Sequence, residues 1–396
     1  MLEEVKMGLR FAAAAALVAL ATPAEAGIAD WNFSPLSADL DGWLATLGGD
    51  GGATLYDGHQ PEGLGRVGVT AAGEADAKLE RIFDNGWTVG ARGTFEVWHD
   101  TLSGDNYGDD FFQKAYGFVQ TKYGRFELGQ QDGAAYKLAE TGPLVAEAPA
   151  LDDANVTFFK TPTGEAFTDF FDVRTGVFAS RNFAKISYYT PQLFGIALGG
   201  SWTPHMAKDV LPFVSAGAHV ANRQENFLEG AASYEGHFGA LTLGGYAGLA
   251  FAHNAARTSG HGDLYDFALG GEADYDFGEE TLALGGAYHQ SNGYGFNPGD
   301  AYSRGQTHAV HVSSTLTRGP WHFGLEYSDG IAGAEFAEPH LDAKGYEASI
   351  GYEVNSNLQI TGGFQQLDDR RSTGAFYNGK PHIRMNAAFL YFHFHV

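Results

Sequence analysis

Residues 265–277 read YDFALGGEADYDF, and this stretch carries the pattern that decides the fold. Apolar side chains occupy alternate positions near both of its ends, and acidic side chains stand between them. Successive side chains of a β-strand point to opposite faces, so a period of two predicts a strand with one apolar and one charged face. The same alternation recurs in WHFGLEY (321–327) and YEASIGYEV (346–354).

The alternation repeats along most of the chain, with short turns between pairs of strands. It predicts sixteen strands, near 51–57, 65–83, 87–99, 111–122, 125–132, 182–190, 194–203, 227–236, 239–252, 264–277, 281–292, 306–317, 320–329, 343–354, 357–368 and 382–396. Seven tight hairpins join them in pairs, at Asn85–Gly86, Tyr123–Gly124, Pro191–Phe194, Gly236–Gly239, Gly278–Glu280, Arg318–Pro320 and Asn355–Asn357. Longer connections rich in polar residues and glycine separate the pairs.

The apolar face is strongly aromatic beside the short turns. The residues concerned are Phe83, Trp87, Phe126, Tyr188, Phe194, Phe238, Phe277 and Trp321. A soluble sandwich also has alternating strands, but these strands are long and their polar face is charged. Aromatic girdles, an apolar outside and a polar inside are typical of outer-membrane barrels. Because lipid leaves no backbone group unpaired, the sheet must close. The fold class predicted is an all-β transmembrane antiparallel barrel of about sixteen strands.

The chain ends FLYFHFHV (389–396), with no polar tail. Alternation places Phe394 on the lipid face and His395 on the lumen face. We expect this last strand to pair with the first and to close the cylinder, which explains why the end does not fray.

Composition and the N-terminus indicate an exported protein that does not bind nucleic acid. Residues 1–26 read as a signal peptide, with Arg10, an apolar stretch and Ala24-Glu25-Ala26 for cleavage; Met7 is an alternative start. The barrel domain is then 27–396. The chain has no cysteine, and its net charge is −24, so it lacks both thiolate metal ligands and the basic face that nucleic acid requires.

Two segments resemble the Gram-negative general porins, of the alphaproteobacterial type. QKAYGFVQTKYGRFELGQQDG (113–133) resembles the porin hairpin in which a strand with Ala-Tyr (Ala115-Tyr116) meets a glycine, an aromatic residue and Leu-Gly after a tight turn (Gly124, Phe126 and Leu128-Gly129). RNFAKISYYTPQLFGIALGGSW (181–202) resembles the porin segment with Ser-Tyr, Thr/Ser-Pro and aromatic-Gly, here Ser187-Tyr188, Thr190-Pro191 and Phe194-Gly195. The chain departs from the family in ending with Val396 instead of Phe and in having Gln130 where Arg is frequent. The resemblance implies a homotrimer and assembly by the outer-membrane machinery through the C-terminal strand.

The resemblance also implies that the longest connection, 133–181, folds into the barrel as a constriction loop. A connection of this length is usually functional. Porin constrictions set loop carboxylates against a basic wall, and a charged ring decides which ions enter. Alternation puts Arg92 and Lys78 on the inner wall. The predicted constriction therefore joins these cations to the loop residues Glu147, Asp152 and Asp153.

The function expected is a water-filled channel in the Gram-negative outer membrane for passive diffusion of small hydrophilic solutes and ions, with weak cation preference. Lipopolysaccharide and membrane lipid would surround it. A solute-specific channel, a barrel enzyme and a structural barrel plugged by its loop remain alternatives.

Two pairs of side chains resemble catalytic or metal sites. His311 and Ser313 share a strand face, as a hydrolase pair might, and His393 and His395 could be imagined as metal ligands, but a polar barrel interior explains both pairs better. No catalytic residue, metal or cofactor is predicted.

Overall fold

The computed structural model describes residues 34–59, 67–100, 106–107, 112–146, 149–151, 175–180, 182–205, 224–254, 263–292, 307–332, 341–371 and 379–396. The predicted signal peptide lies outside the described residues. Within them, no helix is both long enough and apolar enough to cross a membrane.

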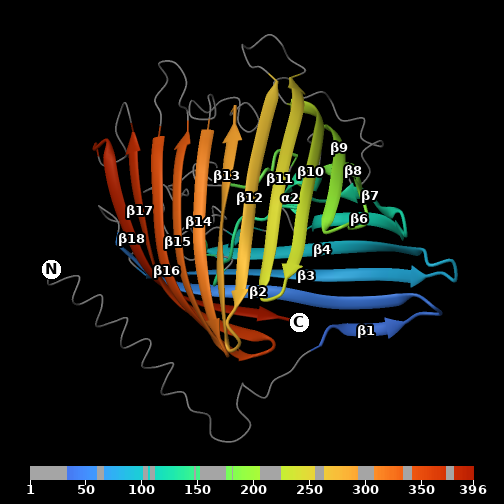
Figure 1. Ribbon diagram of the computed structural model, residues 1–396, viewed down its shortest axis with the longest axis horizontal. Coiled ribbons are helices and arrows are strands. Elements are labelled where there is room, and N and C mark those ends of the chain that lie inside the picture. Colours follow the sequence, from blue (N-terminus) through green and yellow to red (C-terminus); the bar gives the residue numbers. More distant parts are fainter. Residues whose placement is uncertain are drawn as a thin grey trace, which may run out of the picture.

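The sheet is a closed antiparallel barrel of sixteen strands. In chain order these are β2 (Leu44–His59), β3 (Val67–Ile82), β4 (Thr88–Asp100), β6 (Phe112–Thr121), β7 (Gly124–Gln130), β8 (Ala184–Tyr189), β9 (Ile196–His205), β10 (Gln224–Phe238), β11 (Leu241–Asn254), β12 (Leu264–Asp276), β13 (Glu280–Ser291), β14 (Thr307–Arg318), β15 (Trp321–Ala332), β16 (Leu341–Asn355), β17 (Leu358–Arg371) and β18 (His382–His395). The short β1 (Leu36–Asp39) pairs with β2, and β5 (Asn106–Tyr107) pairs with β4. Each strand of the ring pairs with its neighbour in sequence, as Figure 1 shows for β10 to β18 in yellow to red.

The last strand closes the ring, as the sequence predicts. β18 pairs with β2 from Asn386 to His395. The pairing continues to the final residue, because the Val396 amide donates to the Gly49 carbonyl (2.8 Å) and the Gly49 amide donates to the Val396 carbonyl (3.1 Å). A Cβ atom on Gly48 would lie 2.7 Å from the Val396 oxygen, so a glycine is needed where the chain end crosses β2.

The two faces of the wall differ as the alternation predicts. On β14, Val310 and Val312 are exposed, whereas His311 between them is fully buried. The predicted aromatic residues beside the tight turns are exposed, except Tyr188, which is partly covered and packs on Phe126 with ring centroids 4.6 Å apart. Apolar side chains therefore cover the outside, and charged side chains lie on the inside.

Two strand boundaries predicted from the sequence are wrong. β2 begins at Leu44 and not near residue 51, because the glycines of LGGDGG (47–52) continue the strand instead of forming a turn. The hairpin between β10 and β11 turns at Gly239 and Ala240, the far end of the predicted turn Gly236–Gly239, so β10 continues two residues beyond its predicted end at 236. A positive φ of 68° at Gly239 explains the turn position, since side chains disfavour that conformation.

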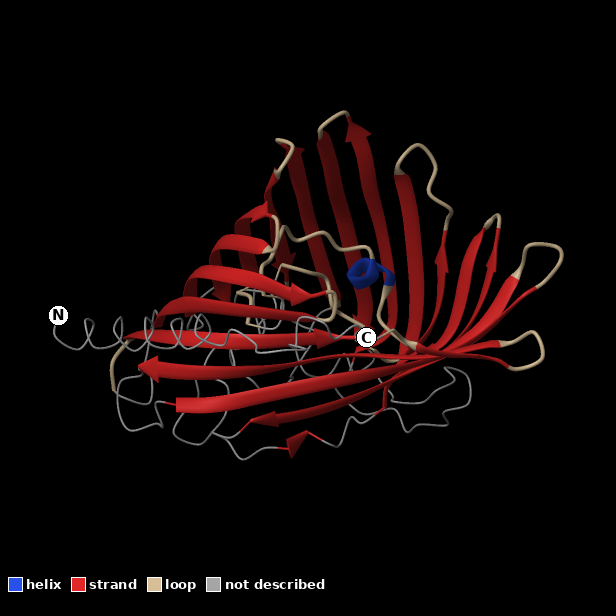
Figure 2. Ribbon diagram, turned by 90° about the horizontal axis from the view of Figure 1, so that it is seen from below, coloured by secondary structure: helices blue, strands red, loops and turns tan. Residues whose placement is uncertain are grey.

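The connection after β7 contains the short helix α2 (Ala134–Lys137), which lies within the space that the strands enclose (Figures 1 and 2). Its residues contact the wall on β8, β9, β10 and β11. Hydrogen bonds further along the connection reach β14, β15 and β17 on the other side of the ring. Residues 152–174 of the predicted loop lie outside the described part of the chain.

Candidate functional site

The inner wall of β3 and β4 carries the two cations predicted from the sequence. Lys78 and Arg92 are cross-strand partners. The Arg92 guanidinium forms two hydrogen bonds with the Asp76 carboxylate, at 2.8 and 2.6 Å, and Lys78 pairs with Glu80 at 2.8 Å. The sequence placed both cations on the inner wall, and the structure adds that they face each other across neighbouring strands. The sequence prediction did not anticipate that each would be paired with a carboxylate of β3.

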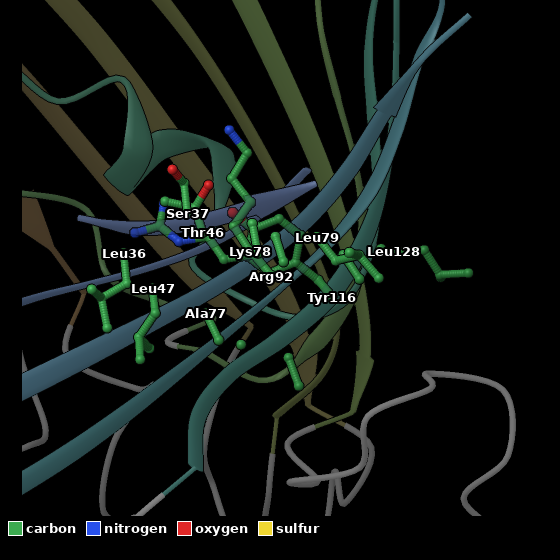
Figure 3. Close-up of a pocket in the computed structure, with 16 residues that line it drawn as sticks. Leu36, Ser37, Thr46, Leu47, Ala77, Lys78, Leu79, Arg92, Tyr116 and Leu128 are labelled. Atoms are coloured by element: carbon green, nitrogen blue, oxygen red, sulfur yellow. The ribbon is translucent and has the colours of Figure 1, made fainter. Parts of the chain in front are cut away.

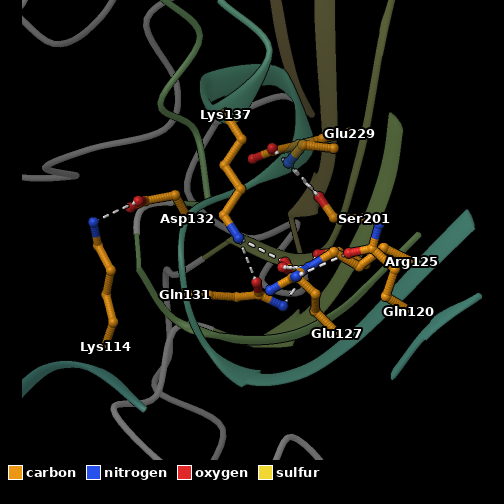
Figure 4. Close-up of polar contacts among 11 residues, drawn as sticks. Lys114, Gln120, Arg125, Glu127, Gln131, Asp132, Lys137, Ser201 and Glu229 are labelled. Carbon is orange, nitrogen blue, oxygen red and sulfur yellow. Dashed lines mark hydrogen bonds and ion pairs between the residues drawn. The ribbon is translucent and has the colours of Figure 1, made fainter. Parts of the chain in front are cut away.

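The basic wall continues through the next strands and into α2 (Figure 4). Lys114 pairs with Asp132 at 2.9 Å. The Glu127 carboxylate receives both Arg125 (2.7 Å) and the Lys137 ammonium (2.6 Å). Because Lys137 belongs to α2 and Glu127 to β7, this ion pair joins the connection to the wall.

The Lys137 side chain is partly buried. Its ammonium also lies 4.7 Å from the centre of the Tyr116 ring, a cation–π distance. Burial lowers the pKa of Lys137, and the neighbouring Glu127 opposes that shift. The favourable pairing with Glu127 therefore offsets part of the cost of taking the ammonium out of water.

Glu229 on β10 anchors both described ends of the connection. Its carboxylate accepts hydrogen bonds from the Ala135 amide (3.3 Å) and from the Ser180 amide (3.1 Å). The Ser201 hydroxyl donates to it from β9 at 3.4 Å. One buried side chain thus holds the beginning and the end of the segment, and nothing in the sequence pattern distinguishes it from other inward-facing acids.

Glycines on the inner face make room for the connection. A Cβ atom on Gly270 would lie 1.8 Å from the Glu140 carbonyl oxygen, and one on Gly285 would lie 2.7 Å from the Gly142 Cα. The recurring Leu-Gly-Gly at 243–245, 269–271 and 284–286 was a usable signal, since the middle glycine of each copy (Gly244, Gly270 and Gly285) lies against the connection. Sequence reasoning missed it.

An acidic cluster faces the lumen beside Gly270 and Gly285. The Glu272 carboxyl lies within hydrogen-bonding reach of Asp274, two residues along β12, and of Glu140 on the connection. These three residues lie across the ring from Lys78 and Arg92 on β3 and β4. A basic wall and an acidic wall can produce an electric field across the lumen. The sequence placed Glu140 in the loop but did not select this cluster.

The predicted loop carboxylates Glu147, Asp152 and Asp153 lie outside the described residues, so their place at the constriction stays a prediction. In the part of the chain that is described, no three His, Cys, Asp or Glu side chains gather as a set that could hold a metal ion.

A groove of about 850 Å³ lies on the outer side of the same wall, under β1 (Figure 3). Lys78 and Arg92 border it, but alternation turns their side chains away from Leu47 and Leu79, which are exposed on the outer face. Seven of its sixteen lining residues are alanine or glycine: Ala38, Ala45, Ala77, Ala91, Gly93, Ala115 and Gly117. The groove is a recess in the outer surface and not part of the lumen.

A family model described as Gram-negative porin matches residues 13–372. The chain belongs to the Gram-negative porin family. The match reaches the end of β17, so it covers fifteen of the sixteen strands of the closed ring. This porin is therefore an outer-membrane channel protein of Gram-negative type.

Solved structures show the same fold. An anion-selective porin from Comamonas acidovorans is 13% identical, with a TM-score of 0.54, covering 89% of this chain and 100% of that one. OmpT, an outer-membrane protein of Vibrio cholerae, is 11% identical, with a TM-score of 0.52 and coverage of 91% and 99%. A mutant of the Rh. blastica porin is 15% identical, with a TM-score of 0.50 and coverage of 89% and 100%. No curated protein matches the porin in sequence.

Proposed function

We propose that this porin passes small hydrophilic solutes and ions by passive diffusion, and that its lumen weakly favours cations. The observation that carries the proposal is the charge distribution of the inner wall. Paired cations on β3 to β7 face a cluster of carboxylates that includes Glu272 and Asp274. A field across the lumen orients dipolar solutes and disfavours apolar ones.

The cation preference follows from the pairing of the basic wall. Lys78 and Arg92 each have a carboxylate partner within 3 Å, so their charge is largely compensated. Glu140, Glu272 and Asp274 lie together, no ion pair among the described residues joins them to a lysine or arginine, and the whole chain carries −24. The Comamonas porin is described as anion-selective. With the cation preference proposed here, two barrels of the same fold would select ions of opposite sign.

A salt gradient across a planar bilayer tests the ion preference. We expect a zero-current potential of the sign that indicates cation flow, growing as salt falls, since the Debye length lengthens from roughly 10 Å at 0.1 M to 30 Å at 0.01 M. The double substitution Asp152→Asn with Asp153→Asn should reduce this potential if both residues belong to the constriction.

The control removes two acids from exposed tight turns, by Asp84→Asn with Glu279→Gln. It changes the net charge equally and should leave the potential nearly unchanged. Anion preference in the wild type defeats the proposed selectivity, and an equal effect of both double variants defeats the assignment of Asp152 and Asp153.

The outer groove supports a homotrimer as the assembled form. Alanines and glycines allow close approach of another wall, and the groove is a hollow of about 850 Å³ that lipid or a second copy of the chain can fill. We assign it to the second copy.

Ala91→Trp in the groove should convert trimers to monomers in analytical ultracentrifugation, whereas Ala348→Trp, also exposed but on β16, should not. Trimers that persist in Ala91→Trp contradict this interface.

The remaining partners follow from the barrel's place in the membrane. Lipid and lipopolysaccharide would contact the apolar outer face, and the assembly machinery would recognise β18. The porin is proposed to be a channel and not an enzyme. The surroundings of His311 support this. Its two ring nitrogens lie beside the Thr141 carbonyl (3.1 Å) and the Glu326 carboxylate (3.4 Å), so these contacts of the ring are to the connection and to the wall and not to a nucleophile.

A further inference from the structure

Two buried carboxylates face each other on the inner wall. Glu326 on β15 and Glu347 on β16 are cross-strand partners, and only 6% and 4% of their surfaces are exposed. Opposed like charges on neighbouring strands are destabilising, and removing them from water adds to that cost. A pair of this kind requires neutralisation.

Neutral oxygen groups surround the pair. Ser313 on β14 is the partner of Glu326, and Gln365 on β17 is the partner of Glu347, so the four residues form one row across four strands. Ser328 and Ser349 each lie two residues from a glutamate on the same face, one on either side of this row. All of these side chains are buried.

In each of the two carboxylates, one oxygen accepts a hydrogen bond and the other does not. The Leu151 amide donates to Glu326 Oε2 (3.1 Å), and Gln365 Nε2 donates to Glu347 Oε2 (3.1 Å). The remaining buried oxygens have no hydrogen-bond partner within the described part of the chain; they are Glu326 Oε1, Glu347 Oε1, Gln365 Oε1 and the hydroxyls of Ser313, Ser328 and Ser349. Buried polar atoms normally have a partner, so the unpartnered oxygens of Glu326, Glu347 and Gln365, which are neighbours along one row, point to a missing positive ligand.

The charges facing the pair do not neutralise it. His311 Nε2 is 3.4 Å from Glu326 Oε2, and this ring supplies at most one positive charge. Among the ion pairs of the described residues, none joins a lysine or arginine to either glutamate. The connection covers the pair with the Leu151 amide and the Pro149 carbonyl, which accepts from Gln365 at 2.8 Å.

We propose that Glu326, Glu347 and Gln365, with the adjacent serine hydroxyls, bind one divalent cation of the Ca²⁺ class between the wall and residues 149–151. Ca²⁺ takes about six to eight oxygen ligands, mixing carboxylates with neutral oxygens and water, and tolerates irregular geometry. The set contains two carboxylates and otherwise neutral oxygens, which suits Ca²⁺ better than a transition metal.

The site would also fasten the connection to the wall. Glu326 Oε2 already holds the Leu151 amide, so a cation on Oε1 fixes the carboxylate that positions this turn. A cation bound here acts on the folded barrel alone, because the row exists only when β14 to β17 are paired. It therefore stabilises the folded state in proportion to its concentration.

The test is Ca²⁺ titration of the purified, folded full-length porin in detergent after treatment with a chelator. Calorimetry of the wild type should show a saturable site, and the thermal unfolding temperature should rise with Ca²⁺ concentration. Glu326→Gln with Glu347→Gln should weaken the affinity at least tenfold and remove the dependence of the unfolding temperature on Ca²⁺. Glu235→Gln with Glu279→Gln, which removes two acids at the tight-turn rim, should behave as the wild type.

Heat-dependent mobility on gels checks that each variant is folded. If the double glutamine variant does not fold, Ser313→Ala with Ser349→Ala removes two neutral ligands and should still weaken Ca²⁺ binding. The proposal is overturned if the wild type shows no Ca²⁺-dependent heat or stabilisation, which would mean that protons neutralise the pair. It is also overturned if folded variants lacking the glutamates or the serines bind Ca²⁺ as tightly as the wild type.

Discussion

Leu325→Arg should strongly reduce the yield of folded barrel. Leu325 points outward from β15 between the inward-facing positions of Gly324 and Glu326, and 62% of its surface is exposed. An arginine on the lipid face near the bilayer midplane costs roughly 2–4 kcal/mol in barrels of this kind. The fraction of protein that migrates as the compact form before boiling measures the loss.

Leu193→Arg is the matched control. Leu193 is also a leucine with 62% of its surface exposed, but it lies at the tight turn between β8 and β9. Near the interface the same change costs only about 0–1 kcal/mol. Equal yields of the two variants would show that the outer face of β15 does not contact lipid.

Glu229→Ala should release the connection from the wall and make the channel conductance larger and noisier. The change leaves the Ala135 and Ser180 amides without their acceptor, at a cost of roughly 1–3 kcal/mol for each buried donor. It also removes the negative charge whose field acts on the buried Lys185 ammonium. The barrel itself should stay folded, because the backbone pairing of β10 is unaffected.

Single-channel recording measures this effect, and Glu235→Ala provides the comparison. Glu235 lies on the same strand but is exposed near the tight turn. Its removal should leave conductance and noise at wild-type values. Wild-type behaviour in Glu229→Ala would mean that the connection does not depend on Glu229 for its position.

The sixteen strands could be predicted because burial repeats with a period of two and each hairpin has a turn signal. All sixteen occur in the ring. The start of β2 was predicted too late, near residue 51. Glycine has no side chain to place on either face, so LGGDGG (47–52) shows no alternation of apolar and polar residues. Only the contact of Gly48 and Gly49 with Val396 shows why the strand continues there.

The candidate site was predictable in part. Inward placement of Lys78 and Arg92 follows from alternation alone, whereas their pairing across β3 and β4 is known only from the structure. The anchoring by Glu229 depends on residues more than forty positions away, such as Ser180, which no local pattern encodes. The acid cluster at Glu272 likewise requires knowledge of where the connection crosses the barrel.

If the closed barrel encloses a water-filled path, the purified, folded porin conducts ions when it is inserted into a planar bilayer. We expect stepwise, long-lived channels whose conductance rises roughly in proportion to the bulk salt concentration. Protein that is folded by its heat-dependent mobility, inserts into the bilayer and yet produces no conductance steps above background would show that the lumen is closed.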